Sequence, residues 1–387
     1  MGRRRAVLEY KGFEQGPIRP PSEAGSLLIR ITRNCPWNRC TFCPVYKGTE
    51  FSLRPVEHVL EDINAVHGYV LAIRESAAAT GKILPADIHK ITSSEREYDR
   101  VALNAALNWA VSGMQSIFLQ DANSLIIKPE NLITILKHLH GCFPWVERIT
   151  SYARSHTIAR ISDENLDLIA GAGLNRIHIG MESGSDKVLS LMKKGADKAT
   201  HIKAGLKVKR AGMELSEYVM PGLGGAEFSK AHAVETADAL NKINPDFIRL
   251  RTLAIPEHIE LYQDYESGNF KKLTDLETAK ELLLFLRNLE AVTGTLKSDH
   301  VLNLFEDLEG KLPEDKVEME GMIESFLKMS PEDRVVYQMG RRMGFFRGVR
   351  DMADINLRNQ AEEKCRHFKI SPENADRVID ELMKRFI

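Results

Sequence analysis

Two patterns of apolar positions alternate along residues 27–253. Short apolar, often β-branched runs predict strands, and apolar residues at helical spacing between them predict helices. The predicted strands cover 27–32, 116–120, 148–152, 176–179, 214–219 and 247–253. Strands alternating with helices imply parallel βαβ units, and six units are too few for a closed eight-fold barrel. We therefore expect an α/β protein built on a partial (β/α)6 barrel.

The same pattern divides the chain into three regions. Residues 1–26 are rich in Gly, Pro and charge and predict an N-terminal arm, and 27–256 form the barrel. Within the barrel, helices are expected over 56–79 and 98–111, with a loop or insertion at 80–97. Beyond the barrel, Thr274-Asp275-Leu276-Glu277 has the sequence of a capping box. Ser330 and Ser371, each followed by Pro, have the pattern of helix starts, so 257–387 are predicted to be mostly helical.

Polar residues and glycines gather where the predicted strands end. The ends carry Cys35, Gln120–Ser124, Tyr152–Ser155, Gly180–Ser185, Met220–Gly225 and Arg249–Thr252. In β/α barrels the chemistry lies at the C-terminal ends of the strands. A plain scaffold does not require chemistry or glycine at all six ends, so we expect the functional site there.

The first strand leads into a loop with three cysteines within nine residues, namely Cys35, Cys40 and Cys43. Thiolates are soft ligands, and three of them this close can surround one metal centre. Cys142 and Cys365 are distant in sequence, so no nearby cysteine completes a set of four. A 4Fe–4S cluster held by three thiolates keeps one iron open. An open metal position suits catalysis, whereas structural zinc sites are closed.

This cysteine loop after a first strand resembles that of the radical S-adenosylmethionine superfamily. In that family three cysteines bind a 4Fe–4S cluster, and the open iron takes the amino group and carboxylate of S-adenosylmethionine. Reductive cleavage gives methionine and a 5′-deoxyadenosyl radical, which takes a hydrogen atom from the substrate. The usual spacing is three residues and then two, whereas here it is four and then two. The resemblance implies Cys35, Cys40 and Cys43 as metal ligands, and a one-electron donor such as flavodoxin or ferredoxin.

Residues 176–195 resemble the matching segment of one branch of the superfamily. That branch includes the anaerobic coproporphyrinogen oxidases, the methylthiotransferases and the Elongator catalytic subunit. There, a polar side chain at the position of Glu182 lies against the cofactor's ribose, and a carboxylate can accept hydrogen bonds from two hydroxyls. Ser183 is assigned to the cofactor with it. Alternatively, Ser183 or Ser185 caps the next helix and Glu182 favours the helix N-terminus, and both interpretations can hold together.

The other strand ends supply further candidates for the cofactor. Arg154 is predicted to bind its carboxylate, because a guanidinium fork matches that shape; a surface salt bridge is the alternative. Many family members have a Gly-Gly-Glu type segment that pairs with the amino group. This chain departs from it, and Asp121 or Asn123 is expected to accept that hydrogen bond instead.

Two candidates follow from the family's adenine contacts. Gly222 lies in a turn that resembles the glycine-rich turn where backbone packs near the adenine. Phe42 matches the aromatic position beside it, although simple loop packing explains that residue equally well. Arg251 is a candidate for the cofactor or the substrate, or it neutralises a carboxylate of the barrel.

Substrate choice is expected to depend on the C-terminal region. His300 is a candidate proton donor or substrate contact, although a lone histidine is more often a hydrogen-bonded structural residue. Residues 341–350 are basic with interleaved aromatics and suit an anionic substrate, a nucleic acid or a partner. A solvated helix face is the plainer interpretation of that run.

Composition excludes several classes of protein. The formal net charge is −1, so no global field attracts nucleic acid or an anionic membrane. No apolar run approaches the ~18 residues needed to span a bilayer, so no membrane partner is expected. The five cysteines are few, odd in number and unevenly spread, which argues against disulfides. We expect a cytoplasmic protein in a reducing compartment.

These observations favour an enzyme that cleaves S-adenosylmethionine at a 4Fe–4S cluster and acts on an unidentified small molecule. An RNA- or protein-modifying enzyme of the same superfamily is the alternative. A third possibility is a non-catalytic iron–sulfur or zinc protein, in which His58 or His67 supplies the fourth zinc ligand.

Overall fold

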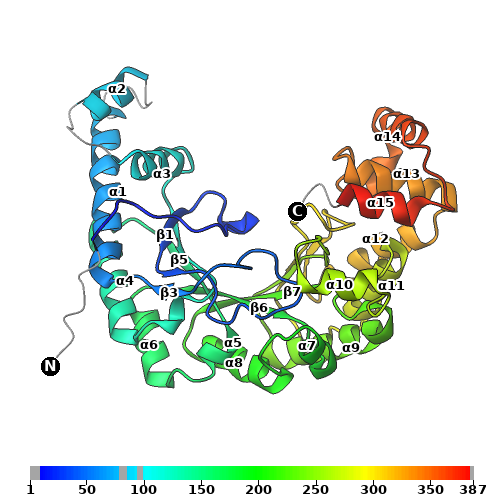
Figure 1. The fold of residues 1–387 in the computed structure, drawn as a ribbon, viewed down its shortest axis with the longest axis horizontal. Helices are drawn as coiled ribbons and strands as arrows, with labels where there is room; N and C mark the ends of the chain where they lie inside the picture. The colour runs from blue at the N-terminus through cyan, green and yellow to red at the C-terminus, as the bar shows by residue number, and fades with distance from the viewer. Residues whose placement is uncertain (1–8, 78–84, 94–98, 384–387) are drawn as a thin grey trace. The chain divides into compact units, whose positions relative to one another are not determined.

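The computed structural model describes residues 9–77, 85–93 and 99–383. The chain forms two compact units, each assembled from segments that are distant in sequence (Figure 1). The first unit comprises Met1–Pro36, Thr49–Ala153 and Ser162–Ile177. The second comprises Trp37–Gly48, Arg154–Ile161 and His178–Ile387.

The first unit contains three parallel strands in the order β1 (Leu27–Arg30), β4 (Ser116–Gln120) and β5 (Arg148–Ala153). Its helices and 3₁₀ turns are η1 (Pro21–Glu23), α1 (Val56–Ala77), α2 (Pro85–Ser93), α3 (Arg100–Val111), η2 (Ser124–Ile126), α4 (Pro129–Cys142) and α6 (Asp163–Gly171). The short strands β2 (Thr32–Arg33) and β3 (Ser52–Leu53) form a separate antiparallel pair. Trp109, Phe118 and Phe143 are fully buried in this unit.

The second unit continues the βα alternation. Its strands lie in the order β6 (Arg176–Glu182, from His178 onward in this unit), β7 (Glu214–Val219), β8 (Phe247–Leu250), β9 (Thr295–Lys297) and β10 (Glu309–Lys311). Strands β7, β8 and β9 are parallel, and β10 is antiparallel to β9. The helices among these strands are α5 (Ser155–Ile158), α7 (Asp186–Leu191), α8 (Lys198–Arg210) and α9 (Gly225–Ile243).

The C-terminal part of the second unit is mostly helical. It contains α10 (Glu260–Glu266), α11 (Asp275–Arg287), α12 (Lys316–Leu327), α13 (Pro331–Arg342), η3 (Val349–Ala353), α14 (Ile355–His367) and α15 (Ala375–Met383). Thr274 and Glu277 form the predicted capping box of α11, and Ser330 caps α13. Residues of α13 and α15 share an apolar cluster that includes Met339, Ile379 and Leu382.

The predicted fold class is confirmed: the protein is α/β, with parallel strands followed by helices and a helical C-terminal region. Three local predictions were wrong. Helix α2 forms within the predicted loop 80–97, β9 and β10 follow the strand predicted to be last, and the last helix begins at Ala375 rather than after Ser371. Strands of three residues are too short to show a hydrophobic period, which explains why β9 and β10 were missed.

Some sequence predictions lie outside the described residues. They are the first eight residues of the arm, the end of the first helix beyond Ala77, and the helix start at Tyr98. Within the part of the chain that the structure describes, no helix is both long enough and apolar enough to cross a membrane.

Candidate active site

The second half of the cysteine loop is anchored in the second unit by backbone hydrogen bonds on both sides. The Thr41 N–H donates to the Met192 carbonyl at 3.1 Å, and the Thr41 carbonyl accepts from Leu261 N–H at 3.0 Å. Phe42 is buried in an apolar cluster with residues of α7 and of the strand ends, against which the half-buried Cys40 and Cys43 pack. The Cys40 and Cys43 thiols therefore lie on a loop that is fixed by hydrogen bonds and packed against apolar side chains.

Trp37 joins this loop to the turn after α7. Its indole Nε1–H donates to the Lys193 carbonyl at 2.7 Å. Gly195 adopts a φ of +71°, and a Cβ at this position would overlap the Trp37 ring, so both conformation and space require glycine. The guanidinium of Arg154 lies 5.0 Å from the Trp37 ring centroid and donates to the Lys194 carbonyl at 2.9 Å. The structure thus places Arg154 beside the cysteine loop, held by cation–π contact.

Glu182 ends β6 in a left-handed conformation, with a φ of 64°. Such backbone costs on the order of 1–3 kcal/mol for a residue other than glycine and occurs often at functional sites. Gly180 makes room for the side chain, because a Cβ there would overlap the Glu182 carboxylate. Glu182 Oε1 accepts from Lys194 Nζ at 3.1 Å. The predicted ribose ligand therefore forms an ion pair in the protein alone.

Lys194 connects this carboxylate to the cysteine loop. Its Nζ lies 5.7 Å from the Phe42 ring centroid. Burial acts to lower the pKa of Lys194, but the Glu182 carboxylate and the Cys40 sulfur outweigh it and raise the pKa above its ordinary value. The ammonium is therefore charged at neutral pH, between a carboxylate and a predicted metal ligand.

Two further ionisable groups are buried in this part of the second unit. Glu217 on β7 and His201 on α8 are inaccessible to solvent. Neither the Glu217 oxygens nor the His201 ring nitrogens have hydrogen-bond partners among the described residues. Burial has the larger effect on the pKa of His201 and the nearby Lys194 the smaller one, and together they lower it to about 3.

Sequence reasoning missed Glu217, His201 and Lys194. A charged residue in the middle of the predicted strand 214–219 was the available signal for Glu217.

Ser183 takes part in a buried hydrogen-bond network. Its Oγ accepts from the Ser185 N–H at 3.0 Å and is hydrogen-bonded to His232 Nδ1 at 2.8 Å. Ser185 precedes α7, but its side chain does not cap that helix. The Gly222 N–H donates to Glu281 Oε1 at 2.7 Å. These contacts fix the ends of β6 and β7, on which Glu182 and the glycine-rich turn depend.

The other candidates of the second unit lie in a separate group. Arg251 is exposed at the end of β8. His300 accepts a hydrogen bond from the Leu302 N–H at Nδ1, at 3.2 Å. Burial and the nearby Arg251 lower the pKa of His300 to about 4. The ring is therefore neutral at pH 7, so it suits accepting a hydrogen bond or proton better than donating the extra proton of an imidazolium.

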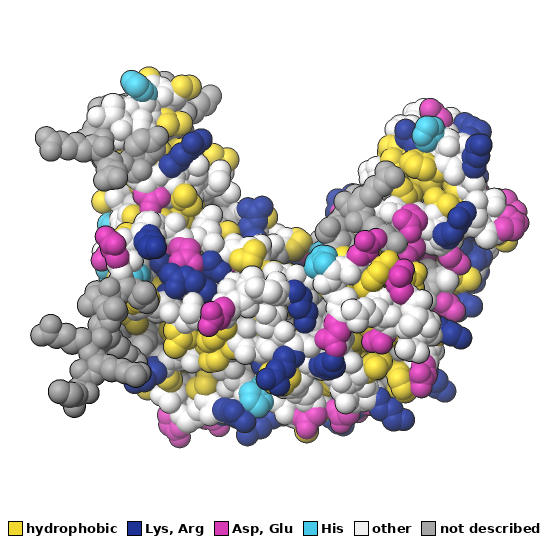
Figure 2. All heavy atoms as spheres, viewed as in Figure 1, with side chains coloured by type: hydrophobic (Ala, Val, Ile, Leu, Met, Phe, Trp, Pro, Cys, Tyr) yellow, Lys and Arg dark blue, Asp and Glu magenta, His cyan; other side chains and the backbone are white. Residues whose placement is uncertain are grey.

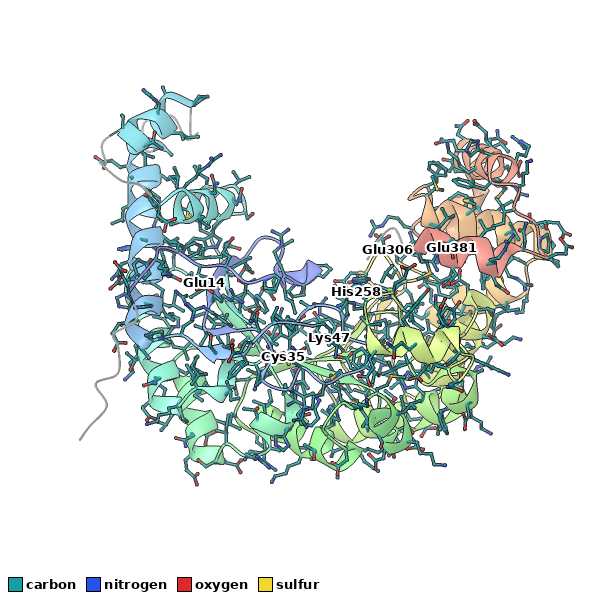
Figure 3. The ribbon with its side chains drawn as sticks, in the orientation of Figure 1. Glu14, Cys35, Lys47, His258, Glu306 and Glu381 are labelled. Atoms are coloured by element: carbon teal, nitrogen blue, oxygen red, sulfur yellow. The ribbon has the colours of Figure 1, made fainter. Side chains whose placement is uncertain are left out.

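In the first unit, Asp121 forms a buried ion pair. Its Oδ2 lies 2.7 Å from an Arg30 guanidinium nitrogen and accepts from the Asn34 N–H at 3.2 Å. Arg30 also pairs with Glu14 at 2.6 Å (Figure 3). Asn123, which is close to Asp121 in sequence, is fully buried. Asp121 thus already has a cationic partner, and a ligand's amino group would share it.

The three cysteines of the motif fall in both units, Cys35 in the first and Cys40 and Cys43 in the second. None of the five cysteines forms a disulfide in this structure. Among the residues that the structure describes, no three or more His, Cys, Asp or Glu side chains gather as a metal-binding group. The ligand set therefore stays a prediction from the motif. Its donor chemistry, three thiols within nine residues, fits an iron–sulfur cluster.

The basic run 341–350 is not simply a solvated helix face. Arg341 and Arg342 are 3% exposed. Their guanidinium groups donate to the carbonyls of Leu304 and Leu302 at 3.0 Å and pair with Glu306 and Asp275. Both guanidinium groups therefore stabilise the folded C-terminal region. Because they are buried and already paired, they cannot bind an anionic ligand.

Part of this chain is similar in sequence to a known protein family. Residues 85–237 match the family model described as "Radical SAM superfamily". A tRNA uridine(34) acetyltransferase of Methanocaldococcus jannaschii is 19% identical over 70% of this chain and 50% of its own length. A tRNA-2-methylthio-N(6)-dimethylallyladenosine synthase of Hahella chejuensis is 26% identical over 62% of this chain and 45% of its own length. The chain thus spans half or less of these relatives.

A solved structure, coproporphyrinogen III oxidase of Escherichia coli, described as a radical SAM enzyme, has a TM-score of 0.45 and 14% identity. The alignment covers 68% of this chain and 52% of that one.

The matched family model describes a class of enzymes that use a 4Fe–4S cluster and S-adenosylmethionine, and it covers less than half of this chain. The predicted resemblance to the radical S-adenosylmethionine superfamily, and to its coproporphyrinogen oxidase, methylthiotransferase and Elongator branch, is confirmed by these matches. The family match begins after the cysteine loop, so it leaves the cysteine assignments as predictions.

Proposed function

We propose that this protein reductively cleaves S-adenosylmethionine and removes a hydrogen atom from a substrate, with its cofactor site beside Glu182 and Lys194. The observation that carries the proposal is the ion pair of Glu182 and Lys194 next to Phe42 and Cys40 in the second unit. When bound, the cluster supplies one electron and S-adenosylmethionine supplies the radical. A one-electron donor such as flavodoxin or ferredoxin completes the reaction.

The residues have distinct roles in this proposal. Cys35, Cys40 and Cys43 hold the cluster, and the charge of Lys194 stabilises the nearby Cys40 thiolate. Glu182 accepts hydrogen bonds from the ribose. Phe42 and its apolar cluster exclude water.

The remaining sequence candidates complete the cofactor site. Arg154 binds the cofactor's carboxylate, Gly222 lies by the adenine, and Ser183 supports Glu182. Asp121 or Asn123 accepts a hydrogen bond from the amino group.

Glu182→Ala should weaken S-adenosylmethionine binding at least about tenfold while iron content holds, because hydrogen bonds to a charged group are lost. Isothermal titration calorimetry of anaerobically reconstituted protein gives the affinity, and a colorimetric assay gives the iron. Glu260→Ala is the matched control, since Glu260 is half-exposed and forms an ion pair with Lys193. Unchanged affinity in Glu182→Ala would remove this residue from the cofactor site.

A small or medium-sized substrate is supported by a cavity of about 360 Å³ at the ends of β7 and β8. Volumes of this size are typical of small-molecule sites. Helices α10, α11 and α15 complete the lining. Its acidic residues, Glu266, Asp275, Asp376, Asp380 and Glu381, outnumber its basic residues, Lys272 and Arg377. Such a lining disfavours a phosphodiester backbone and favours a neutral or cationic substrate.

A tRNA substrate is the second candidate, favoured by the names of the two sequence relatives. Against it, Lys and Arg side chains are intermixed with Asp and Glu over the C-terminal helices rather than gathered in one patch (Figure 2). Gel shifts with bulk tRNA at several salt concentrations separate the two. Binding that weakens steeply with salt, with tRNA-stimulated release of 5′-deoxyadenosine, would favour tRNA. Absence of binding at low salt would leave the small molecule.

A further inference from the structure

Glu217, in the middle of β7, has no part in the function proposed so far. Its side chain is inaccessible to solvent, and neither oxygen has a hydrogen-bond partner among the described residues. Nearly all buried polar groups in native proteins are satisfied, and an unsatisfied one costs about 1–3 kcal/mol. Glu217 therefore lacks a partner that some other state of the protein should provide.

The surroundings of Glu217 indicate the charge of that partner. The charged groups that act on it are Glu182 from β6 and Lys194 from the turn after α7. Lys194 is hydrogen-bonded to Glu182, whereas neither Glu217 oxygen has a hydrogen-bond partner among the described residues. Burial first, and the Glu182 carboxylate second, raise the pKa of Glu217 well above its ordinary value. The cluster formed by Glu182, Lys194 and Glu217 can therefore accept one more positive charge.

We propose that Glu217 is a specificity residue that favours the positively charged sulfonium of S-adenosylmethionine over neutral analogues. The inference rests on the proposed function, because it takes the cofactor to bind beside Glu182. A cation that enters this group supplies the partner that Glu217 lacks. The only bond that breaks is the O–H bond of the Glu217 carboxyl: its proton passes to solvent, and the carboxylate becomes the counter-ion of the ligand.

S-Adenosylhomocysteine provides the test, because it lacks the sulfonium methyl group and its sulfur is neutral. Calorimetry on reconstituted protein gives the affinities of both ligands for the wild type, Glu217→Gln and the control Glu214→Gln, which is exposed at the start of β7. Glutamine keeps the size and hydrogen-bonding capacity of the side chain but cannot ionise. In Glu217→Gln the preference for S-adenosylmethionine should fall about tenfold or more, with little change for the neutral ligand. Glu217→Asp, which keeps the charge, should retain most of the preference.

Calorimetry in two buffers of different ionisation enthalpy counts protons. The wild type should release protons on binding S-adenosylmethionine, and Glu217→Gln should release none. An unchanged ligand preference, or an equal loss for both ligands, would overturn the inference. If Glu217→Gln does not fold, the wild-type proton count decides, and no release overturns it. If Glu182→Ala weakens binding while Glu217→Gln keeps the preference, the proposed function stands and this inference fails.

Discussion

Replacement of Cys35, Cys40 or Cys43 by alanine should each abolish cleavage of S-adenosylmethionine and greatly reduce bound iron. Each substitution leaves only two of the three predicted thiolate ligands, which are too few to hold the cluster. Anaerobic reconstitution of the wild type should yield about four irons with broad absorption near 400 nm. With dithionite and S-adenosylmethionine, it should release 5′-deoxyadenosine, which chromatography measures.

Cys142→Ala and Cys365→Ala are the matched controls and should keep both iron and activity. Cys142 is buried in the first unit, and burial raises the pKa of its thiol. Burial also raises the pKa of Cys365 to about 11. Thiols that stay protonated at neutral pH are poor metal ligands. Iron loss in either control would show that the ligand set is wrong, and a colourless protein with one tightly bound zinc would reject the cluster itself.

A loss of stability in acid should depend on His201. Its folded-state pKa is lowered from 6.5 to about 3, by burial and then by Lys194, partly opposed by Asp197. The unfolded chain therefore binds more protons than the folded protein below about pH 6.5. The stability that His201 contributes is present above that pH and is lost as pH falls toward 3. By pH 4 the loss is on the order of 3 kcal/mol.

Urea unfolding followed by circular dichroism at pH 7 and pH 5 measures this effect. In His201→Leu, which has no titrating group at this position, the decrease in unfolding free energy between the two pH values should be clearly smaller. His300, whose pKa is lowered to about 4, acts in the same direction in both proteins and so cancels in the comparison. An equal pH dependence in wild type and variant would show that His201 is not held neutral by the fold.

The cysteine loop and the segment around Glu182 show how much of the site can be predicted from sequence. Cys35, Cys40 and Cys43 are close in sequence, and their spacing predicts a metal site, which the family resemblance makes a 4Fe–4S cluster. Glu182 follows a strand and precedes a glycine and a helix, so its place at a strand end is a local property. The βα alternation is local in the same way, because hydrophobic period is set by neighbouring residues. The fold class was therefore predictable.

The pairing of buried charges could not be predicted from the sequence. Lys194, His201 and Glu217 come from a turn, a helix and a strand, and nothing in their separate neighbourhoods indicates that they act on one another or on Glu182. The basic run at Arg341 and Arg342 predicted solvated cations, whereas both guanidinium groups are buried against carbonyls of the preceding loop. Ionisation and burial depend on long-range packing, which local patterns do not contain.

By itself, the sequence determined that this chain is an α/β protein with a three-cysteine motif, since periodicity and spacing are properties of adjacent residues. Only the tertiary structure decided which charges share a buried environment, and so that Lys194 pairs with Glu182 while Glu217 remains without a partner. The physical reason is that the free energy of a buried charge depends on every group packed around it, and the fold brings those groups together from distant parts of the chain.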